Sequence, residues 1–268
     1  MELGHDPYAV FASSTKPAGL YARRKWLDHG HTQQWKADYE QCVKAVLSHQ
    51  SPDGSWQGSV VETIRHLFDL HLTIRQANRE IDIALDWLID LATDEMKRRS
   101  ADNEPLSEEK LFSLPFAPGC FDTLLTSSAL FLSSIFGRDR DERILTMYES
   151  HSNAILTGEA LHQGWRSINN ILRAFVVHPV YSMNMATKSL VKKLAGVQRE
   201  SGRWENDIDM YQTVNALAHL ELKDADSQAR KAFCHLAKSQ NNDGTWGETD
   251  REWKTFLVVH AMKNKRVL

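Results

Sequence analysis

The chain has 268 residues, of which 42% are hydrophobic and 25% are charged, and its formal net charge is −3. These proportions are typical of a globular protein. The negative net charge and the absence of a run of Lys and Arg exclude electrostatic binding of nucleic acid. The three cysteines, Cys42, Cys120 and Cys234, form no C-x-x-C pair. This spacing excludes a cysteine-rich zinc module and favours reduced thiols in a cytoplasmic protein.

The N-terminal residues lack the basic and apolar regions of a signal peptide, and no apolar stretch approaches the roughly 18 residues of a membrane span. We therefore expect no membrane span, and peripheral contact with a membrane surface stays open. Residues 1–33 are predicted to form an N-terminal extension, and residues 34–268 one helical domain.

The first predicted helix covers Tyr39–His49 and ends at a segment, Gln50–Trp56, that reads Q-S-P-D-G-S-W. Gly54 ends this helix, because glycine takes the left-handed conformation there at low cost. A second, apolar helix covers Thr63–Leu70. An amphipathic helix over Glu80–Leu91 follows, since its apolar residues recur at helical intervals.

The segment Lys97–Pro118 interrupts this pattern and predicts a long loop with a short helix over Glu108–Phe112, or else a domain boundary. Beyond it, apolar and amphipathic helices alternate. They are an apolar helix from about Cys120 to Ile135, then Glu142–Ile155, Trp165–Phe175, Tyr181–Leu194 with an end near Val197, Thr213–Leu220, Ala229–Ser239 and Thr255–Met262.

Three segments share the spacing Q-x-x-x-G-x-W, and they begin at Gln50, Gln198 and Gln240. Each copy joins a helix to a second helix, so the repeated unit is a helical hairpin. The Trp is predicted to pack against a neighbouring unit, and the Gln to bridge backbone groups at nearby helix ends. The interval between the first two copies has room for about three more units, which predicts an all-α chain of ten or eleven helices.

This repeat resembles the QW motif of squalene and oxidosqualene cyclases, and also the repeats of protein prenyltransferase β subunits. The resemblance covers residues 35–264 and implies an α/α toroid of about five helical hairpins. In those enzymes, concentric rings of helices surround a cavity that binds isoprenoid chains. The chain has the length of one such barrel, whereas the hopene-type cyclases carry two.

Class II cyclases carry a D-x-D-D-T motif whose middle Asp protonates the substrate. Around Asp122 the chain keeps only the last Asp of that motif, and Phe121 stands where the acid would be. Around Asp209, an alignment through Thr213 places Tyr211 at the position of the acid. Asp122 and Asp209 remain the two candidate catalytic residues, because apolar or aromatic neighbours can desolvate a carboxyl and raise its pKa.

Four aromatic residues are predicted to line the substrate pocket, namely Phe121, Trp165, Tyr211 and Trp253. Their faces can stabilise a carbocation, although core packing is an alternative for the two tryptophans. No metal site and no cofactor are expected, and magnesium would enter only with a diphosphate substrate.

The resemblance therefore implies an enzyme that cyclises or isomerises an isoprenoid or another long apolar substrate by acid catalysis. One alternative is a non-catalytic toroid that binds a lipid or a partner protein. The other is a zinc-dependent, prenyltransferase-like protein with Cys120, Asp122, His219 and His260 near the metal. The sequence leaves the oligomeric state open.

Overall fold

The computed structural model describes residues 2–100, 106–205 and 207–268, without the side chains of 98–100, and within them the fold is all-α, as predicted. Three isolated β-bridges stand outside the helices, and the described residues contain no strand. The helices are α1 (Pro17–Lys25), α2 (Gln33–Leu47), α3 (Val60–Thr73), α4 (Arg79–Thr93), α5 (Glu95–Ser100), α6 (Phe121–Ile135), α7 (Glu142–Thr157), α8 (Gly164–Phe175), α9 (Met185–Gly196), α10 (Met210–Ala218), α11 (Lys223–Lys238) and α12 (Arg251–Asn264).

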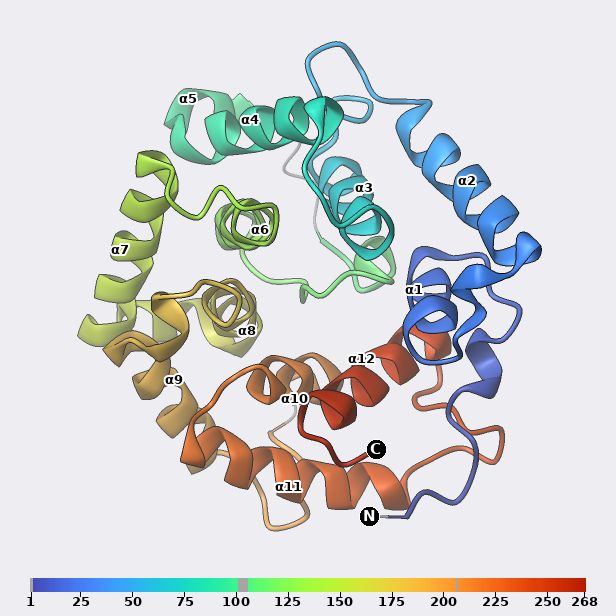
Figure 1. Cartoon of the computed structure of the whole chain (residues 1–268). Helices are drawn as coiled ribbons and strands as arrows, with labels where there is room; N and C mark the ends of the chain where they lie inside the picture. Colours follow the sequence, from blue (N-terminus) through green and yellow to red (C-terminus); the bar gives the residue numbers. More distant parts are fainter. Residues whose placement is uncertain (1, 101–105, 206) are drawn as a thin grey trace.

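Six helices form an inner ring: α1, α3, α6, α8, α10 and α12 (Figure 1). Each of them contacts the next one, and α12 returns to contact α1, so the cycle is closed. Five outer helices, α2, α4, α7, α9 and α11, lie around this ring. Successive inner and outer helices therefore form hairpins whose inner members surround one axis.

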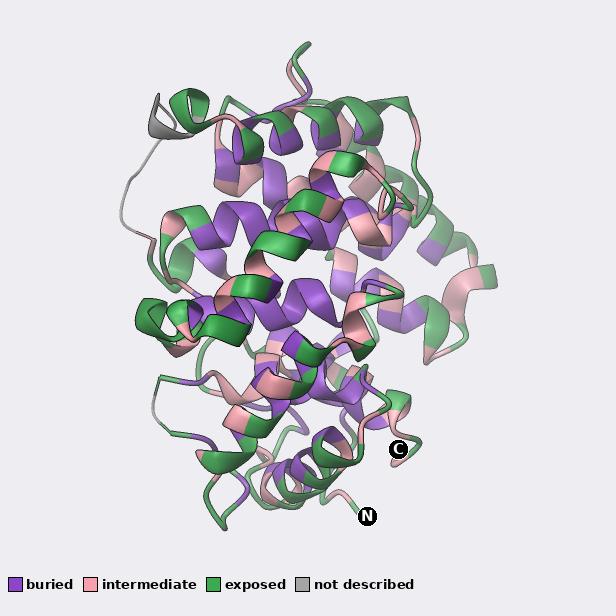
Figure 2. Cartoon of the chain, turned by 90° about the vertical axis from the view of Figure 1, so that its left-hand side faces the viewer, coloured by how far each residue is buried: buried purple, intermediate pink, exposed green. Residues whose placement is uncertain are grey.

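The outer helices are amphipathic and bury only the face that meets the inner ring. Figure 2 shows exposed residues on the outward side of these helices and buried residues beneath them. In α4, Ile81, Leu85 and Leu88 are fully buried at helical spacing. Asn78 caps this helix, because its side chain accepts a hydrogen bond from the backbone N–H of Ile81.

The Gln of each repeat links one unit to the next. Gln50 Nε2 donates to the carbonyl of Gly54 in its own turn, at 3.0 Å, and to that of Glu80 in α4, at 2.8 Å. Gln198 repeats this geometry with its own turn and with α11. The predicted bridging role of these side chains is therefore confirmed.

The Trp of each repeat is buried beneath the hairpin. Trp56 and Trp246 are almost completely inaccessible, and each donates its indole N–H to a carbonyl of the preceding outer helix, at 2.8 Å. In both copies the backbone N–H of the Trp donates to a Thr of the following inner helix. In these two copies one Trp thus links the outer helix and the inner helix of its unit.

The N-terminal segment closes the ring. Gln240 Nε2 donates to the carbonyl of Gly244 and to that of His5, at 3.0 and 3.1 Å, so residues near His5 take the place that an outer helix takes in the other repeats. Residues 1–33, predicted as an extension, also supply α1 to the inner ring. Their short helix lacks the repeat motif, which is why the sequence pattern passed over it.

The interruption before α6 is shorter than predicted. Helix α5 extends to Ser100, and a 3₁₀ turn at Glu109–Leu111 stands where a short helix over Glu108–Phe112 was expected. Residues 101–105 of this predicted loop lie outside the described residues. No helix within the described ranges is long and apolar enough to cross a membrane.

Candidate functional site

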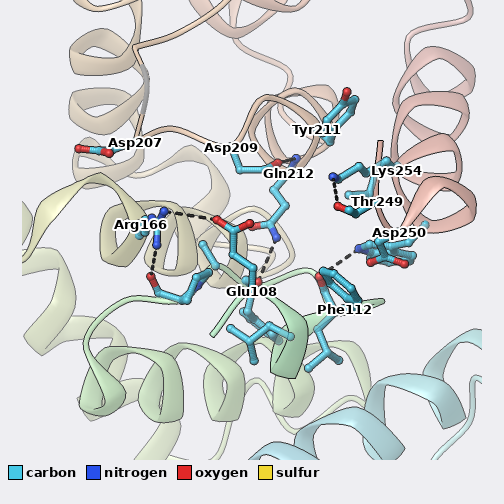
Figure 3. A pocket seen from close by; sticks show the side chains of 17 residues that line it. Glu108, Phe112, Arg166, Asp207, Asp209, Tyr211, Gln212, Thr249, Asp250 and Lys254 are labelled. Atoms are coloured by element: carbon cyan, nitrogen blue, oxygen red, sulfur yellow. Dashed lines mark hydrogen bonds and ion pairs between the residues drawn. The ribbon is translucent and has the colours of Figure 1, made fainter. Parts of the chain in front are cut away.

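A pocket of about 150 Å³ lies at the N-terminal ends of α8, α10 and α12 (Figure 3). The segment 108–118 forms its other wall. Apolar side chains from this segment face polar ones from the helix ends. The ionisable residues that line it are Glu108, Arg166, Asp207, Asp209, Asp250 and Lys254. We refer to this cavity as the mouth pocket.

Hydrogen bonds from four inner helices hold the segment 108–118 in place. Arg65 of α3 donates to the carbonyls of Lys110 and Phe112, both at 2.6 Å. Asn170 of α8 pairs with both backbone groups of Ala117. Gln212 of α10 donates to the carbonyl of Phe116, and Trp253 of α12 donates to that of Leu114. The wall of the mouth pocket is therefore anchored along its length.

Asp209 is the acid that this geometry favours most. It caps α10, where its Oδ1 accepts a hydrogen bond from the backbone N–H of Gln212 at 2.7 Å. Burial raises the pKa of Asp209, and this effect outweighs the lowering by the hydrogen bond to Gln212 and by the charge of Lys254. A carboxyl with a raised pKa that borders a pocket can deliver a proton there.

Most of the other charged groups of the mouth pocket have partners of their own. Arg166 forms an ion pair with Glu108 at 3.4 Å, and Lys254 lies 5.5 Å from the ring centre of Tyr211. Asp250 accepts a hydrogen bond from the backbone N–H of Ser113 at 2.7 Å. Asp207 is exposed and lies apart from Asp209 (Figure 3).

The predicted site residues divide between several places. Asp209, Tyr211 and Trp253 come together in the mouth pocket. Asp122 is exposed and lines a separate surface pocket with His151 of α7. Phe121 lines a third pocket, beside Arg65.

Trp165 is partly buried and packs against the hydrophobic core. It lines neither the mouth pocket nor the pockets that hold Asp122 and Phe121. The two candidate acids, Asp122 and Asp209, therefore do not share a cavity. Only Asp209 lies in a pocket together with other predicted site residues.

A second cavity, of about 220 Å³, lies among the inner helices, beside the C-terminal halves of α3, α6, α8 and α10, and we call it the central chamber. All six inner helices contribute to it, and Trp253 and Leu257 line both it and the mouth pocket. Its aromatic side chains are in contact: the ring of Trp253 stacks on Phe256 at 5.2 Å, and Phe256 stacks on His260 at 5.7 Å. The ring axis thus holds two cavities with a shared wall.

The polar lining of the central chamber consists of basic and neutral side chains. Arg75, Arg173, Asn215, His71, His219, His260 and Tyr21 line it, and none of its lining residues in the described chain is an Asp or Glu. Burial lowers the pKa of His71 to about 3 and that of His260 to about 4, with Arg75 adding to both effects. Both imidazoles are therefore neutral near pH 7.

Sequence reasoning missed Arg75, Arg173 and Asn215. Helical periodicity identified the inner helices, but it gives no signal for which polar residues of different helices converge on the axis. Arg173 lies between Leu172 and Ala174, and Asn215 lies between Val214 and Ala216. These apolar neighbours were the available clue, because a buried polar or charged side chain needs a partner.

The described residues contain no group of three or more His, Cys, Asp or Glu side chains placed to hold a metal ion. His219 and His260 line the central chamber with their ring centres 5.2 Å apart, whereas Cys120 is exposed at the start of α6. This distribution does not favour the zinc alternative.

No known protein-family model matches the chain, and no curated protein matches it either. Among solved structures, the chain is similar to a protein from Actinoplanes known from a crystal structure. The two share 16% sequence identity at a TM-score of 0.58, over 94% of this chain and 89% of that one. At this identity the similarity concerns the fold alone.

Proposed function

We propose that this protein is an enzyme of the terpene cyclase type, which cyclises or isomerises an isoprenoid or another long apolar substrate by acid catalysis. In this proposal the ring is an α/α toroid and the three Q-x-x-x-G-x-W segments are QW motifs. The observation that carries the proposal is Asp209, whose carboxyl has a raised pKa and borders a pocket walled by Trp253.

The chemistry starts with the acid form of Asp209. Its proton adds to one carbon of a substrate double bond, which leaves the carboxylate on Asp209 and a carbocation on the substrate. A second double bond of the substrate can then attack the cation and close a ring. Loss of a proton from a neighbouring carbon ends the reaction, so the product is an isomer of the substrate. The aromatic faces of Trp253 and Tyr211 would stabilise the cation.

The test is incubation of the purified protein with a panel of prenyl diphosphates and linear triterpenes, with and without magnesium. We expect a product of the same mass as one substrate. D209N should lower its rate by a factor of about 10² or more, since Asn cannot donate this proton. Asn also caps helices well, so the start of α10 should be retained.

D122N is the matched control, because Asp122 lies in a different pocket and is exposed. It should react at the wild-type rate. Unchanged substrate across the whole panel, or equal rates for D209N and the wild type, would contradict the proposal.

The size of the cavities counts against a long substrate, and it supports one second candidate, a ring that binds a smaller ligand without transforming it. The mouth pocket and the central chamber measure about 150 and 220 Å³, both below the roughly 300–1,000 Å³ of typical ligand pockets. A non-catalytic ring predicts that D209N binds its ligand as the wild type does and that neither protein forms product.

A further inference from the structure

The central chamber contains a buried guanidinium that lacks an anionic partner. The side chain of Arg173 is only 4% exposed, and it forms no ion pair with any described carboxylate. Its Nη1 donates to Oδ1 of Asn215 at 2.7 Å, while its buried Nε has no hydrogen-bond partner. Burying a charge in this state is strongly unfavourable unless an anion compensates for it.

The neighbours of Arg173 hold its guanidinium in place and leave it charged. Asn215 accepts from Arg173 and in turn donates to the carbonyl of Leu257 at 2.9 Å, which fixes the direction of its amide. Burial lowers the pKa of Arg173 to about 10, an effect that an ionised Asp209 would oppose in part, so the guanidinium stays charged at neutral pH. The buried Nδ1 of His71, another lining residue, also has no hydrogen-bond partner.

A second guanidinium stands where the chamber meets solvent. Arg75 follows α3, is exposed, and lies 5.4 Å from the ring centre of Tyr21. Two guanidinium groups and no carboxylate thus line one small cavity within the described chain. Guanidinium groups bind carboxylates and phosphates with paired hydrogen bonds, and they do so more strongly when shielded from water.

We propose that the central chamber binds a small molecule with a carboxylate or phosphate group on a compact apolar body. Arg173 and Arg75 hold the anionic group, and the aromatic surface of Phe68, Trp253 and Phe256 covers the body. The volume of about 220 Å³ restricts the ligand to the size of a single substituted ring. This site does not depend on Asp209 and stands whether or not the mouth pocket catalyses a reaction.

The test is isothermal titration of the full chain with phenylacetate, phenyl phosphate and the neutral analogue phenylacetamide. We expect one anion or both to bind at one site per chain, and phenylacetamide to bind at least about tenfold more weakly. The stronger of the two anions identifies the group that the site prefers. Equal binding of phenylacetamide, or no binding of either anion at 10 mM (roughly the limit for a specific small ligand), would overturn the proposal.

Three variants separate binding from folding. R75N should weaken anion binding by about tenfold with an unchanged melting temperature, because Arg75 is exposed and its φ of +66° suits Asn. R173M should abolish binding without lowering the melting temperature, since an apolar side chain of similar volume replaces an uncompensated charge. R230N, which removes one charge from the exposed face of α11, should bind like the wild type.

Wild-type affinity in both R75N and R173M would contradict the assignment. The D209N variant distinguishes this site from the proposed catalytic one. It should bind phenylacetate and phenyl phosphate at least as tightly as the wild type, even if it proves inactive toward isoprenoids. Lost anion binding in a folded D209N protein would mean that the two cavities form one site.

Discussion

Asp209 combines two roles in one carboxyl group. As the cap of α10 it accepts a hydrogen bond from the backbone, and this interaction favours the ionised form. Burial favours the protonated form and dominates. A protonated carboxyl still has one acceptor oxygen for the cap and one O–H for a substrate. The same residue can therefore hold the helix and deliver a proton.

A second partly buried carboxyl, Asp69 of α3, makes stability depend on pH. Burial raises its pKa from 3.8 to about 7, so between these values the unfolded chain has released a proton that the folded chain retains. The contribution of Asp69 to stability is therefore complete below pH 4 and is lost as the pH rises through 7. D69N should be more stable than the wild type at pH 8, by up to about 4 kcal/mol, and equal to it near pH 4.

Urea unfolding of both proteins across this pH range measures the difference in free energy. D122N serves as the control for an exposed carboxyl, and its curve should follow that of the wild type. A difference between D69N and the wild type that does not change with pH would contradict the raised pKa of Asp69.

At the scale of the elements, the turns between outer and inner helices depend on backbone contact between repeats. Gly202 has a φ of +89°, and a Cβ placed on it would collide with the backbone carbonyl of Lys231 in α11. The equivalent glycines, Gly54 and Gly244, face backbone atoms of the neighbouring element in the same way. Each glycine thus allows the left-handed backbone of its own turn and the close approach of the neighbouring element.

Gly158 provides a matched comparison for this double constraint. Its φ of +91° is nearly that of Gly202, but a Cβ there would meet no atom within 4 Å. G158A should cost about 1 kcal/mol of stability, from the left-handed backbone alone. G202A should cost more by about 2 kcal/mol or above, because backbone must also move. Chemical denaturation of the two variants checks this, and equal losses would refute the role of the junction.

At the scale of the whole molecule, the two ends of the chain close the ring. The backbone N–H of His5 donates to Gln240 Oε1, and Gln240 Nε2 donates back to the carbonyl of His5. Phe11 is fully buried and packs edge-on against Trp26 and Phe256, at 5.6 and 6.5 Å between ring centres. The N-terminal residues therefore belong to the same core as α12.

This closure predicts that Phe11, which lies outside every repeat motif in the sequence, is important for stability. F11A should destabilise the fold by about 3–5 kcal/mol, as expected for a large aromatic side chain removed from a core. L156A, which truncates a side chain that is 54% exposed on α7, should change stability by less than about 0.5 kcal/mol. Thermal and urea unfolding measure both, and a small effect of F11A would show that the N-terminal residues do not stabilise the ring.

Much of the helix arrangement follows from the sequence. Within each repeat the Gln contacts the Gly of its own turn, so the spacing of these residues is constrained. The repeats predicted the helices around Gln50, Gln198 and Gln240 and the contacts of those side chains. They did not predict α1, whose nine residues carry no repeat.

The candidate site was predicted only in part, because the sequence shows neighbours along one helix but not contacts between helices. The aromatic neighbours of Asp209 along the sequence indicated its desolvation, whereas Asp122 has similar neighbours and is exposed. Arg75 and Arg173 line the same chamber because of the angles between the helices. The periodicity of a single helix does not predict those angles.

The protonation state of Asp209 decides whether this residue can act as the acid of the mouth pocket. Infrared difference spectra of the wild type against D209N, recorded from pH 3 to pH 9 (roughly the range in which buried carboxyls titrate), isolate the carboxyl band of this residue. The proposed acid role predicts a protonated Asp209 band that persists above pH 3.8, the ordinary pKa of an aspartate. A band that converts to the carboxylate form near pH 4 would contradict it, because such a group is already ionised at neutral pH and has no proton to deliver.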